Sequence, residues 1–144
     1  MCVKGDHMKI INADGLVLGR LASIIAKQLL NDNEIVVINA EKAIVTGTKK
    51  AVFTKYKKMR ELSHPRKGPH FPRMPDQILK RTVRGMIPSQ TPRGRKAIKN
   101  LKVYIGTPKE FESKKSQTIE QAYVGPVNQY VELGDVSRFL GAKY

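Results

Sequence analysis

The first part of the chain changes its spacing of apolar residues twice. Residues 9–13 form a short apolar-rich segment closed by an Asp-Gly turn signal, which predicts a strand. From Leu18 apolar residues recur every three or four positions, which predicts one buried helix face over 18–29. The β-branched run at 35–38 is apolar on both faces and predicts a central strand of a parallel sheet. Together these elements predict a right-handed βαβ unit.

Two polar residues in the middle of the chain stand where helices are expected to begin. Thr48 is expected to cap a helix that reaches about Met59. Asp76 is expected to cap another helix, which reaches about Met86. Residues 43–46, which precede these two helices in the chain, have a pattern that fits either a further strand or a turn of helix.

Proline marks the loop between these helices and the start of the next one. Residues 63–75 hold four prolines and a glycine, so no regular element is expected there. We expect this loop to be ordered only where something holds it. Thr91 and Pro92 predict a further helix, with a capping hydroxyl followed by a proline in the first helical position.

The two helices after the loop have one apolar side and one cationic side. At about 100° per residue, the apolar residues of each helix share one arc and the basic residues share the opposite arc. The predicted inward residues are Ile78, Leu79, Val83, Met86, Ala97, Ile98 and Leu101. The predicted outward residues are Lys80, Arg81, Arg84, Arg95, Lys96 and Lys99. Each helix is therefore expected to fold onto a core and to present positive charge outward.

The last third of the chain has weaker patterns. A strand is expected over 101–105, and 107–129 fits mostly loop with a short helix near 118–122. Residues 130–133 fit an edge strand, and Asp135 is expected to cap a last helix. The apolar residues that this helix should bury are Val136, Phe139 and Leu140. The length of the chain fits one domain with a core of its own.

Positive charge is concentrated between Lys49 and Lys102. This segment holds 17 of the chain's 27 Lys and Arg but only two of its 12 acids, Glu61 and Asp76, so the whole formal net charge of +15 falls within it. Repulsion among these charges opposes a compact state unless a bound polyanion neutralises them. The expected binding partner is therefore nucleic acid first and an anionic membrane second. No apolar run is long enough for a membrane span, and no secretory leader is expected. Cys2 is the only cysteine, so no internal disulfide is expected, which suits the cytoplasm.

The placement of the basic residues favours RNA. They are spread over three helices and a proline-rich loop, which suits phosphate and 2′-hydroxyl contacts on an irregular folded surface. Like charges one turn apart within the helices also indicate phosphates outside. His70 and Phe71 are candidates for stacking on unpaired bases, whereas Tyr56 fits the core better. Phe71, which lies near prolines, fits equally well stacking on a base or on a neighbouring protein, or packing within this chain. The candidate RNA-binding residues are Lys49, Lys50, Lys57, Lys58, Arg60, Arg66, Lys67, His70, Phe71, Arg73, Lys80, Arg81, Arg84, Arg93, Arg95, Lys96 and Lys99.

Catalysis and metal binding find little support. No carboxylate cluster marks a two-metal nuclease, and Cys2, His7, His64 and His70 lack the spacing of zinc ligands. The Gly-Thr-Lys sequence at 47–49 lacks the first glycine of a phosphate-binding loop. We therefore expect no enzyme activity, cofactor, metal or small-molecule substrate. An RNA-processing enzyme is the alternative to a structural RNA-binding protein.

A combined pattern of motifs resembles a known family. Its segments are Val83-Arg84-Gly85-Met86-Ile87-Pro88, Gly94-Arg95, Leu101-Lys102-Val103-Tyr104-Ile105-Gly106, Asp14-Gly15, Leu18-Gly19-Arg20-Leu21-Ala22, Asn39-Ala40-Glu41-Lys42 and Thr46-Gly47. Over residues 9–144 the chain resembles the large-subunit ribosomal protein L-thirteen family. Residues 66–69 and 92–96 are similar to its archaeal and eukaryotic branch.

The resemblance implies a fold and a role. The fold is α/β: a three-layer domain with a mainly parallel central sheet of about four strands, helices on both faces, and the basic helices and loop on one side. The role is that of a structural constituent of the large ribosomal subunit in the cytoplasm. It binds large-subunit ribosomal RNA early in assembly, beside neighbouring large-subunit ribosomal proteins, with no catalytic role and no membrane. A translational regulator that acts off the ribosome stays open as a further alternative.

The resemblance also suggests how the chain is divided. Residues 1–8 depart from the family and are expected to be an upstream start or a non-native extension. Residues 9–144 are then expected to form a single α/β domain, which contains the basic RNA-binding segment at 49–102.

Overall fold

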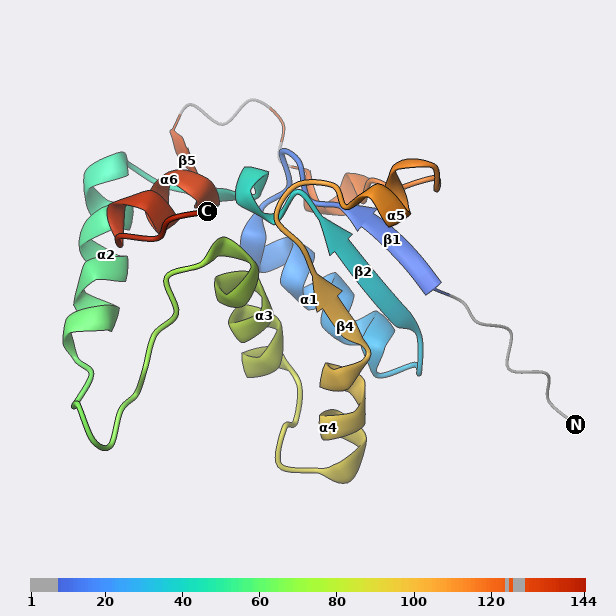
Figure 1. Cartoon of the computed structure of the whole chain (residues 1–144), viewed down its shortest axis with the longest axis horizontal. Helices are drawn as coiled ribbons and strands as arrows, with labels where there is room; N and C mark the ends of the chain where they lie inside the picture. The colour runs from blue at the N-terminus through green and yellow to red at the C-terminus, as the bar shows by residue number, and fades with distance from the viewer. Residues whose placement is uncertain (1–7, 124, 126–128) are drawn as a thin grey trace, which may run out of the picture.

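A parallel sheet forms the centre of the computed structural model, which describes residues 8–123, 125 and 129–144. Strands β1 (Met8–Asn12), β2 (Glu34–Ile38) and β4 (Leu101–Val103) lie in the order β1-β2-β4 (Figure 1). Ile35 of β2 pairs with Lys9 on one side and with Leu101 on the other. The predicted α/β class and its parallel sheet are confirmed, with three strands in the described part of the sheet. Residues 1–7 of the predicted extension lie outside the described residues, and Met8 begins β1.

Both faces of the central strand are buried, as its apolar run predicts. The odd-numbered residues of β2 lie in the large core beneath α1 (Leu18–Leu29). Its even-numbered apolar residues pack with Ile10 and with Phe111 of α5 (Lys109–Glu112) on the opposite face. The sequence pattern did not predict α5, because a helix of one turn is too short to show a helical period.

A separate two-stranded ladder settles the segment that the sequence left open. β3 (Ile44–Thr46) pairs antiparallel with β5 (Tyr130–Glu132), and Val45 lies opposite Val131. Residues 43–46 therefore contain a strand, preceded by the 3-10 turn η1 (Ala40–Lys42), and the predicted edge strand is confirmed. Because β3 pairs with β5, it adds no strand to the parallel sheet. A second 3-10 turn, η2 (Glu120–Ala122), lies where a short helix was expected.

Two of the three basic helices begin at the threonine caps that the sequence predicts. α2 (Lys49–Glu61), α3 (Pro75–Met86) and α4 (Pro92–Lys99) follow one another in the chain. Thr48 Oγ1 accepts a hydrogen bond from the Ala51 N–H at 3.3 Å, and Thr91 Oγ1 accepts one from the Gly94 N–H at 3.1 Å. Both predicted threonine caps are confirmed. At Gly94 a Cβ atom would lie 2.0 Å from the Pro88 carbonyl oxygen, so this turn requires glycine.

The two predicted aspartate caps are wrong. α3 begins at Pro75 and α6 (Leu133–Phe139) begins at Leu133, and neither N-cap side chain makes a capping hydrogen bond. In α3 proline takes the first helical position, where a missing N–H leaves no internal hydrogen bond unmade. Asp76 and Asp135 therefore lie inside the first turns, where their charges still favour the helix through its dipole.

Two residues that were expected to face the core are partly exposed. Met86 is 45% exposed because it is the last residue of α3, and the neighbouring Ile87 turns into the core instead. Phe139 is 47% exposed and stacks on Phe53 of α2, with ring centroids 4.4 Å apart. The packing of α6 against α2 thus takes the Phe139 ring away from the main core.

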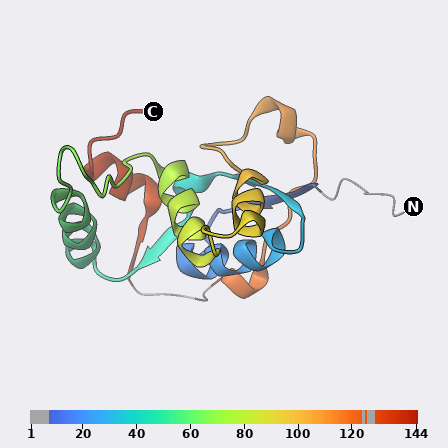
Figure 2. The ribbon, with the colours of Figure 1, turned by 90° about the horizontal axis from the view of Figure 1, so that it is seen from below.

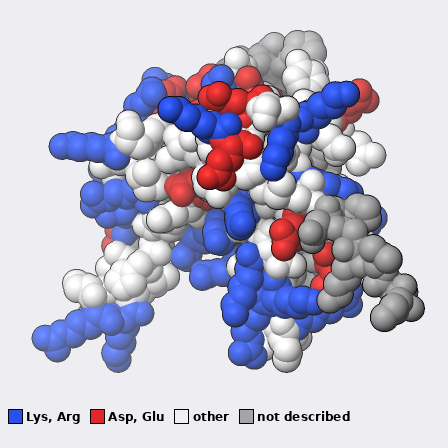
Figure 3. All heavy atoms as spheres, turned by 45° about the vertical axis from the view of Figure 1, so that its right-hand side comes forward, with Lys and Arg blue, Asp and Glu red and all other residues white. Residues whose placement is uncertain are grey.

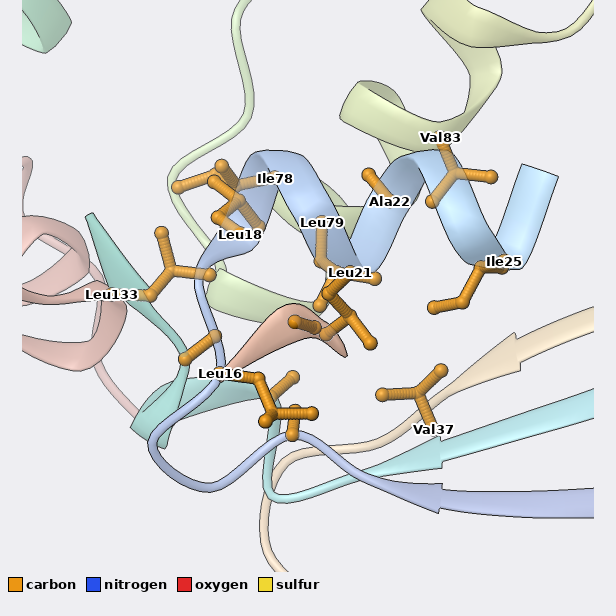
Figure 4. Packing of buried hydrophobic residues seen from close by; sticks show 14 of the residues in the cluster. Leu16, Leu18, Leu21, Ala22, Ile25, Val37, Ile78, Leu79, Val83 and Leu133 are labelled. Carbon is orange, nitrogen blue, oxygen red and sulfur yellow. The ribbon is translucent and has the colours of Figure 1, made fainter. Parts of the chain in front are cut away.

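The main core lies where α1 packs between the sheet and α3 (Figure 4). Leu21 and Ile25 of α1 and Leu79 and Val83 of α3 are completely buried. Ala22, also fully buried, keeps this side of α1 narrow, so that the two helices lie close together. Within the residues that the structure describes, no helix has both the length and the apolar character that crossing a membrane needs.

The contrast between two residues of α3 tests this packing. Leu79→Ala should lower the free energy of unfolding by about 2–5 kcal/mol, because it leaves a cavity where α3 packs against α1. Met86→Ala, on the same helix but partly exposed, should change it by no more than about 0.5 kcal/mol. Urea unfolding followed by circular dichroism measures both. Equal losses for the two variants would show that the end of α3 is packed in solution.

Candidate nucleic-acid interface

The basic segment forms one continuous region of the molecule. α2 stands at one side in Figure 1, the loop of residues 62–74 runs below it, and α3 and α4 lie beside and below the sheet. Seen from below, α3 and α4 lie next to each other in front of α1 (Figure 2). Lys and Arg side chains dominate the lower edge of the molecule in Figure 3, whereas Asp and Glu gather mostly toward the top. The charge that is segregated in the sequence is therefore also segregated in space.

Most of the candidate RNA-binding side chains reach solvent. Three of them, Arg60, Phe71 and Arg81, are half-buried. The others are exposed, and they are Lys49, Lys50, Lys57, Lys58, Arg66, Lys67, His70, Arg73, Lys80, Arg84, Arg93, Arg95, Lys96 and Lys99. The outward positions predicted for the basic residues of α3 and α4 are thus confirmed, with Arg81 the one that is partly covered.

Ion pairs within the protein neutralise little of this charge. In the described part of the chain, two candidate cations lie near carboxylates: Lys57 near Glu61 at 3.7 Å and Lys96 near Asp32 at 3.3 Å. All four side chains are at least 63% exposed. Exposed pairs of this kind contribute only about 0–1 kcal/mol, so a phosphate can replace either carboxylate at little cost.

Two arginines hold the proline-rich loop in place. Arg60 of α2 donates a hydrogen bond to the Phe71 carbonyl oxygen at 3.1 Å, and Arg81 of α3 donates one to the His70 carbonyl oxygen at 3.1 Å. Ser137 of α6, which is completely buried, donates a third hydrogen bond to the carbonyl oxygen of Arg73. Three helices therefore fix the end of the loop without any partner. The sequence predicted that something must hold this loop, and the structure shows that the chain itself does so.

Phe71 anchors the same stretch through its ring. The Arg81 guanidinium lies over the ring at 5.2 Å from its centroid, and Tyr56 meets it edge-on at 5.8 Å. Tyr56 is buried, as expected, and this burial raises the pKa of its hydroxyl. These contacts pack Phe71 against α2 and α3. Its stacking on a base stays a prediction.

Other arginines are also fixed by backbone carbonyl groups. Arg93 donates a hydrogen bond to the Leu30 carbonyl oxygen at 2.7 Å, which ties α4 to the end of α1. Arg95 donates one to the Gln90 carbonyl oxygen at 3.1 Å in the turn before α4. A guanidinium has five N–H donors, so each of these groups keeps donors for an outside partner. Their positions are set before any partner arrives.

Sequence reasoning missed the role of Ser137 and the pairing of Phe53 with Phe139. Ser137 lies 64 residues from the loop carbonyl group that it binds, and nothing in its local sequence signals the contact. Phe53 lies on α2 with Lys49 over its ring at 5.4 Å from the centroid. Both contacts depend on where α6 packs, which the sequence pattern does not show.

The acidic residues near this surface do not form a catalytic arrangement. Glu61 pairs with Lys57, and Asp76 lies in the first turn of α3 with one carboxylate oxygen buried and without a hydrogen-bond partner. Among the described residues there is no group of three or more His, Cys, Asp or Glu side chains that is able to hold a metal ion. The surface offers cationic donors rather than the acid–base pairs of hydrolytic chemistry.

The fold and this surface define the class of the protein: a basic α/β protein whose outer helix faces suit a polyanion. The chain matches the family model described as Ribosomal protein L13 over residues 6–110. It therefore belongs to the ribosomal protein L13 family, as its similarity to three archaeal proteins also shows. The family is structural and non-enzymatic, which confirms the expected absence of enzyme activity and sets the RNA-processing alternative aside.

All three relatives carry the description Large ribosomal subunit protein uL13. The one from Archaeoglobus fulgidus is 49% identical over 140 residues, covering 95% of this chain and 90% of the relative. The one from Methanosphaera stadtmanae is 50% identical over 139 residues, covering 94% and 98%. The one from Methanocaldococcus jannaschii is 43% identical over 143 residues, covering 95% and 100%. The resemblance to the archaeal-type branch is confirmed.

The loop contacts of Arg81 are open to a direct test. Arg81→Gln should speed tryptic cleavage after Arg66 and Lys67 about fivefold, because losing a charged hydrogen bond and the contact with Phe71 favours the open loop by about 1 kcal/mol. Mass spectrometry of the early fragments measures the cleavage rate.

Lys80→Gln is the matched control for this test. It removes one charge from the neighbouring position of α3, and Lys80 is exposed. This variant should be cleaved in the loop at the wild-type rate. Equal cleavage of both variants would mean that Arg81 does not hold the loop.

Proposed function

We propose that this protein is a structural constituent of the large ribosomal subunit and binds large-subunit ribosomal RNA through the basic segment. Family membership supports the ribosomal role, and the names of the relatives point to the large subunit. Neighbouring ribosomal proteins would lie alongside, and the protein would act in the cytoplasm, where ribosomes work. Residues 9–144 would enter the subunit as a single domain.

One observation carries the proposal: the positive charge lies on the sides of the helices that face away from the core. α3 buries Ile78, Leu79 and Val83, and its Lys80 and Arg84 are exposed. Lys80 and Arg84 are one helical turn apart, where like charges destabilise a helix slightly. Such an arrangement is stable in a compact protein when phosphates share the surface.

The shape of the surface favours folded RNA over a regular duplex. The cations come from three helices of different direction and from an irregular loop (Figure 2). No single helix here carries the whole set to a groove, as a recognition helix would. Ribosomal RNA presents phosphates and 2′-hydroxyl groups on an irregular surface, which a spread of fixed cations matches.

The candidate residues would play two parts. The exposed lysines and arginines would neutralise phosphates. Arg60 and Arg81 would in addition keep the loop in the conformation that presents Arg66 and Lys67 outward, because their guanidinium groups bind loop carbonyl groups. Substitutions of the exposed cations are therefore expected to weaken phosphate binding, and substitutions of Arg60 or Arg81 are expected to loosen the loop as well.

Salt dependence tests the phosphate contacts. If six to ten cations contact phosphate, affinity for large-subunit ribosomal RNA should fall by about 10³- to 10⁵-fold between roughly 50 and 200 mM salt, because binding releases condensed counterions. Filter binding over a salt series with the RNA of the source organism measures the slope. A flat titration would remove this mechanism.

Charge reversal tests which surface docks. Arg84→Glu combined with Arg95→Glu should leave the far-ultraviolet circular dichroism unchanged, since both side chains are exposed, yet abolish co-sedimentation with large subunits. The control is Lys109→Glu combined with Lys115→Glu, which makes the same change in net charge outside the basic segment. The control should still co-sediment. Loss of the folded signal in the first variant would show that the two arginines are structural.

A further inference from the structure

A hollow lies between the end of the proline-rich loop, α3 and α4. Its volume is about 350 Å³, within the range of sites that hold small ligands. His70 and Pro72 line it from the loop, Lys80 and Arg84 from α3, and Ile98 from α4. Figure 3 shows the lower edge of the molecule divided into two lobes, with Lys and Arg side chains around the space between them.

The walls of the hollow are cationic. Lys80, Arg81 and Arg84 line it together with His70, and none of the described residues that line it is a carboxylate. Asp76, the acid of α3, does not line it. A group held there would meet several hydrogen-bond donors of one sign, an environment that suits a phosphate.

Arg81 is positioned before a ligand arrives. Its Nη1 atom donates to the His70 carbonyl oxygen at 3.1 Å, and its guanidinium lies over the Phe71 ring. The side chain is half-buried, so it has already lost most of its freedom. A ligand that accepts from its remaining donors therefore meets a preorganised group, which lowers the entropy lost on binding.

Part of the lining of the hollow is apolar. Pro72 and Ile98 are both half-buried, and Ile98 also packs against the main core. Gln77, which also lines the hollow, is exposed and offers an amide donor and acceptor. Cations alone would suffice for the phosphates of a paired stem. A hollow lined by apolar side chains and an amide as well as by cations also fits a flat heterocyclic ring.

We propose that this hollow binds one unpaired nucleotide of RNA that is turned out of its helix. Its phosphate would lie against Arg84, Lys80 and Arg81, and its base would lie on Pro72 and Ile98 within reach of Gln77. This inference rests on the proposed function and adds a subsite for an extruded base to it. The charge of the hollow also suits an acidic segment of a protein, but such a segment would not need the apolar lining by Pro72 and Ile98.

The test compares two short RNA hairpins that differ by one unpaired nucleotide. The bulged hairpin carries 2-aminopurine as its single bulged nucleotide, and the other hairpin is fully paired. Wild-type protein should bind the bulged hairpin about tenfold more tightly, with a change in 2-aminopurine fluorescence, because contact with an unstacked base adds to the phosphate contacts.

Gln77→Glu and Gln90→Glu form a matched pair of variants. Both residues are exposed and lie in the basic segment, but only Gln77 lines the hollow. The carboxylate introduced at position 77 lies in the first turn of α3, where it favours the helix, so the fold should persist. Gln77→Glu should remove the preference for the bulged hairpin, and Gln90→Glu should leave this preference unchanged. Arg84→Gln, which removes a cation without adding a carboxylate, should also reduce the preference.

The outcomes separate this inference from the proposed function. Equal affinity for both hairpins, with the steep salt dependence intact, would overturn the nucleotide site and leave the RNA-binding proposal standing. Equal effects of the two glutamine variants on the bulge preference would also overturn it. If Gln77→Glu weakened the binding of a hexaglutamate peptide but left the preference for the bulged hairpin unchanged, the hollow would be a binding site for an acidic protein segment. A flat salt titration would instead refute the proposed function itself.

Discussion

The packing of α3 against α1 determines where the positive charge of this protein lies. Leu79 and Val83 are fully buried in that contact, opposite Leu21 and Ile25. A helix that buries one side must expose the other, so Lys80 and Arg84 face solvent. The same constraint acts on α4, where the burial of Ala97 leaves Lys96 and Lys99 outside. The burial of apolar side chains in the core therefore sets the direction in which the basic side chains point.

The arrangement has an electrostatic cost that the fold only partly offsets. Like charges sit one turn apart on α3 and α4. Among the described residues, the carboxylates that pair with candidate cations of the basic segment, Glu61 and Asp32, form exposed, weak pairs. Backbone carbonyl groups serve the arginines instead: Arg60, Arg81, Arg93 and Arg95 each donate to one. A carbonyl group fixes the position of a guanidinium without cancelling its charge. The surface is therefore ordered and remains strongly positive, which suits a partner that supplies the missing negative charge.

The loop between α2 and α3 shows how this ordering extends to a segment without regular structure. Its prolines prevent a helix or a strand, yet three side chains from α2, α3 and α6 bind its carbonyl groups. Arg81 takes part both in this network and in the wall of the hollow beside Ile98. Loop order and the shape of the cationic hollow are thus coupled through one guanidinium.

The sequence by itself determined the elements that depend on local periodicity and on turn chemistry. The period of three to four residues from Leu18, the β-branched run of β2, and the Thr48 and Thr91 caps all predicted what the structure contains, because these signals act over a few neighbouring residues. The outward direction of the basic residues followed from the same period. Asp76 was wrongly predicted to be the N-cap of α3. Pro75 before it also favours the start of a helix, and it takes the first helical position.

Only the tertiary structure decided which strands pair and which side chains hold the loop. β3 pairs with β5, about 85 residues further along the chain, so the parallel sheet has three strands in its described part. Phe139 stacks on Phe53 and Ser137 binds the loop because α6 packs beside α2 and α3. Contacts between residues so far apart in the chain depend on how whole helices and strands pack against one another. The local sequence pattern does not determine this packing.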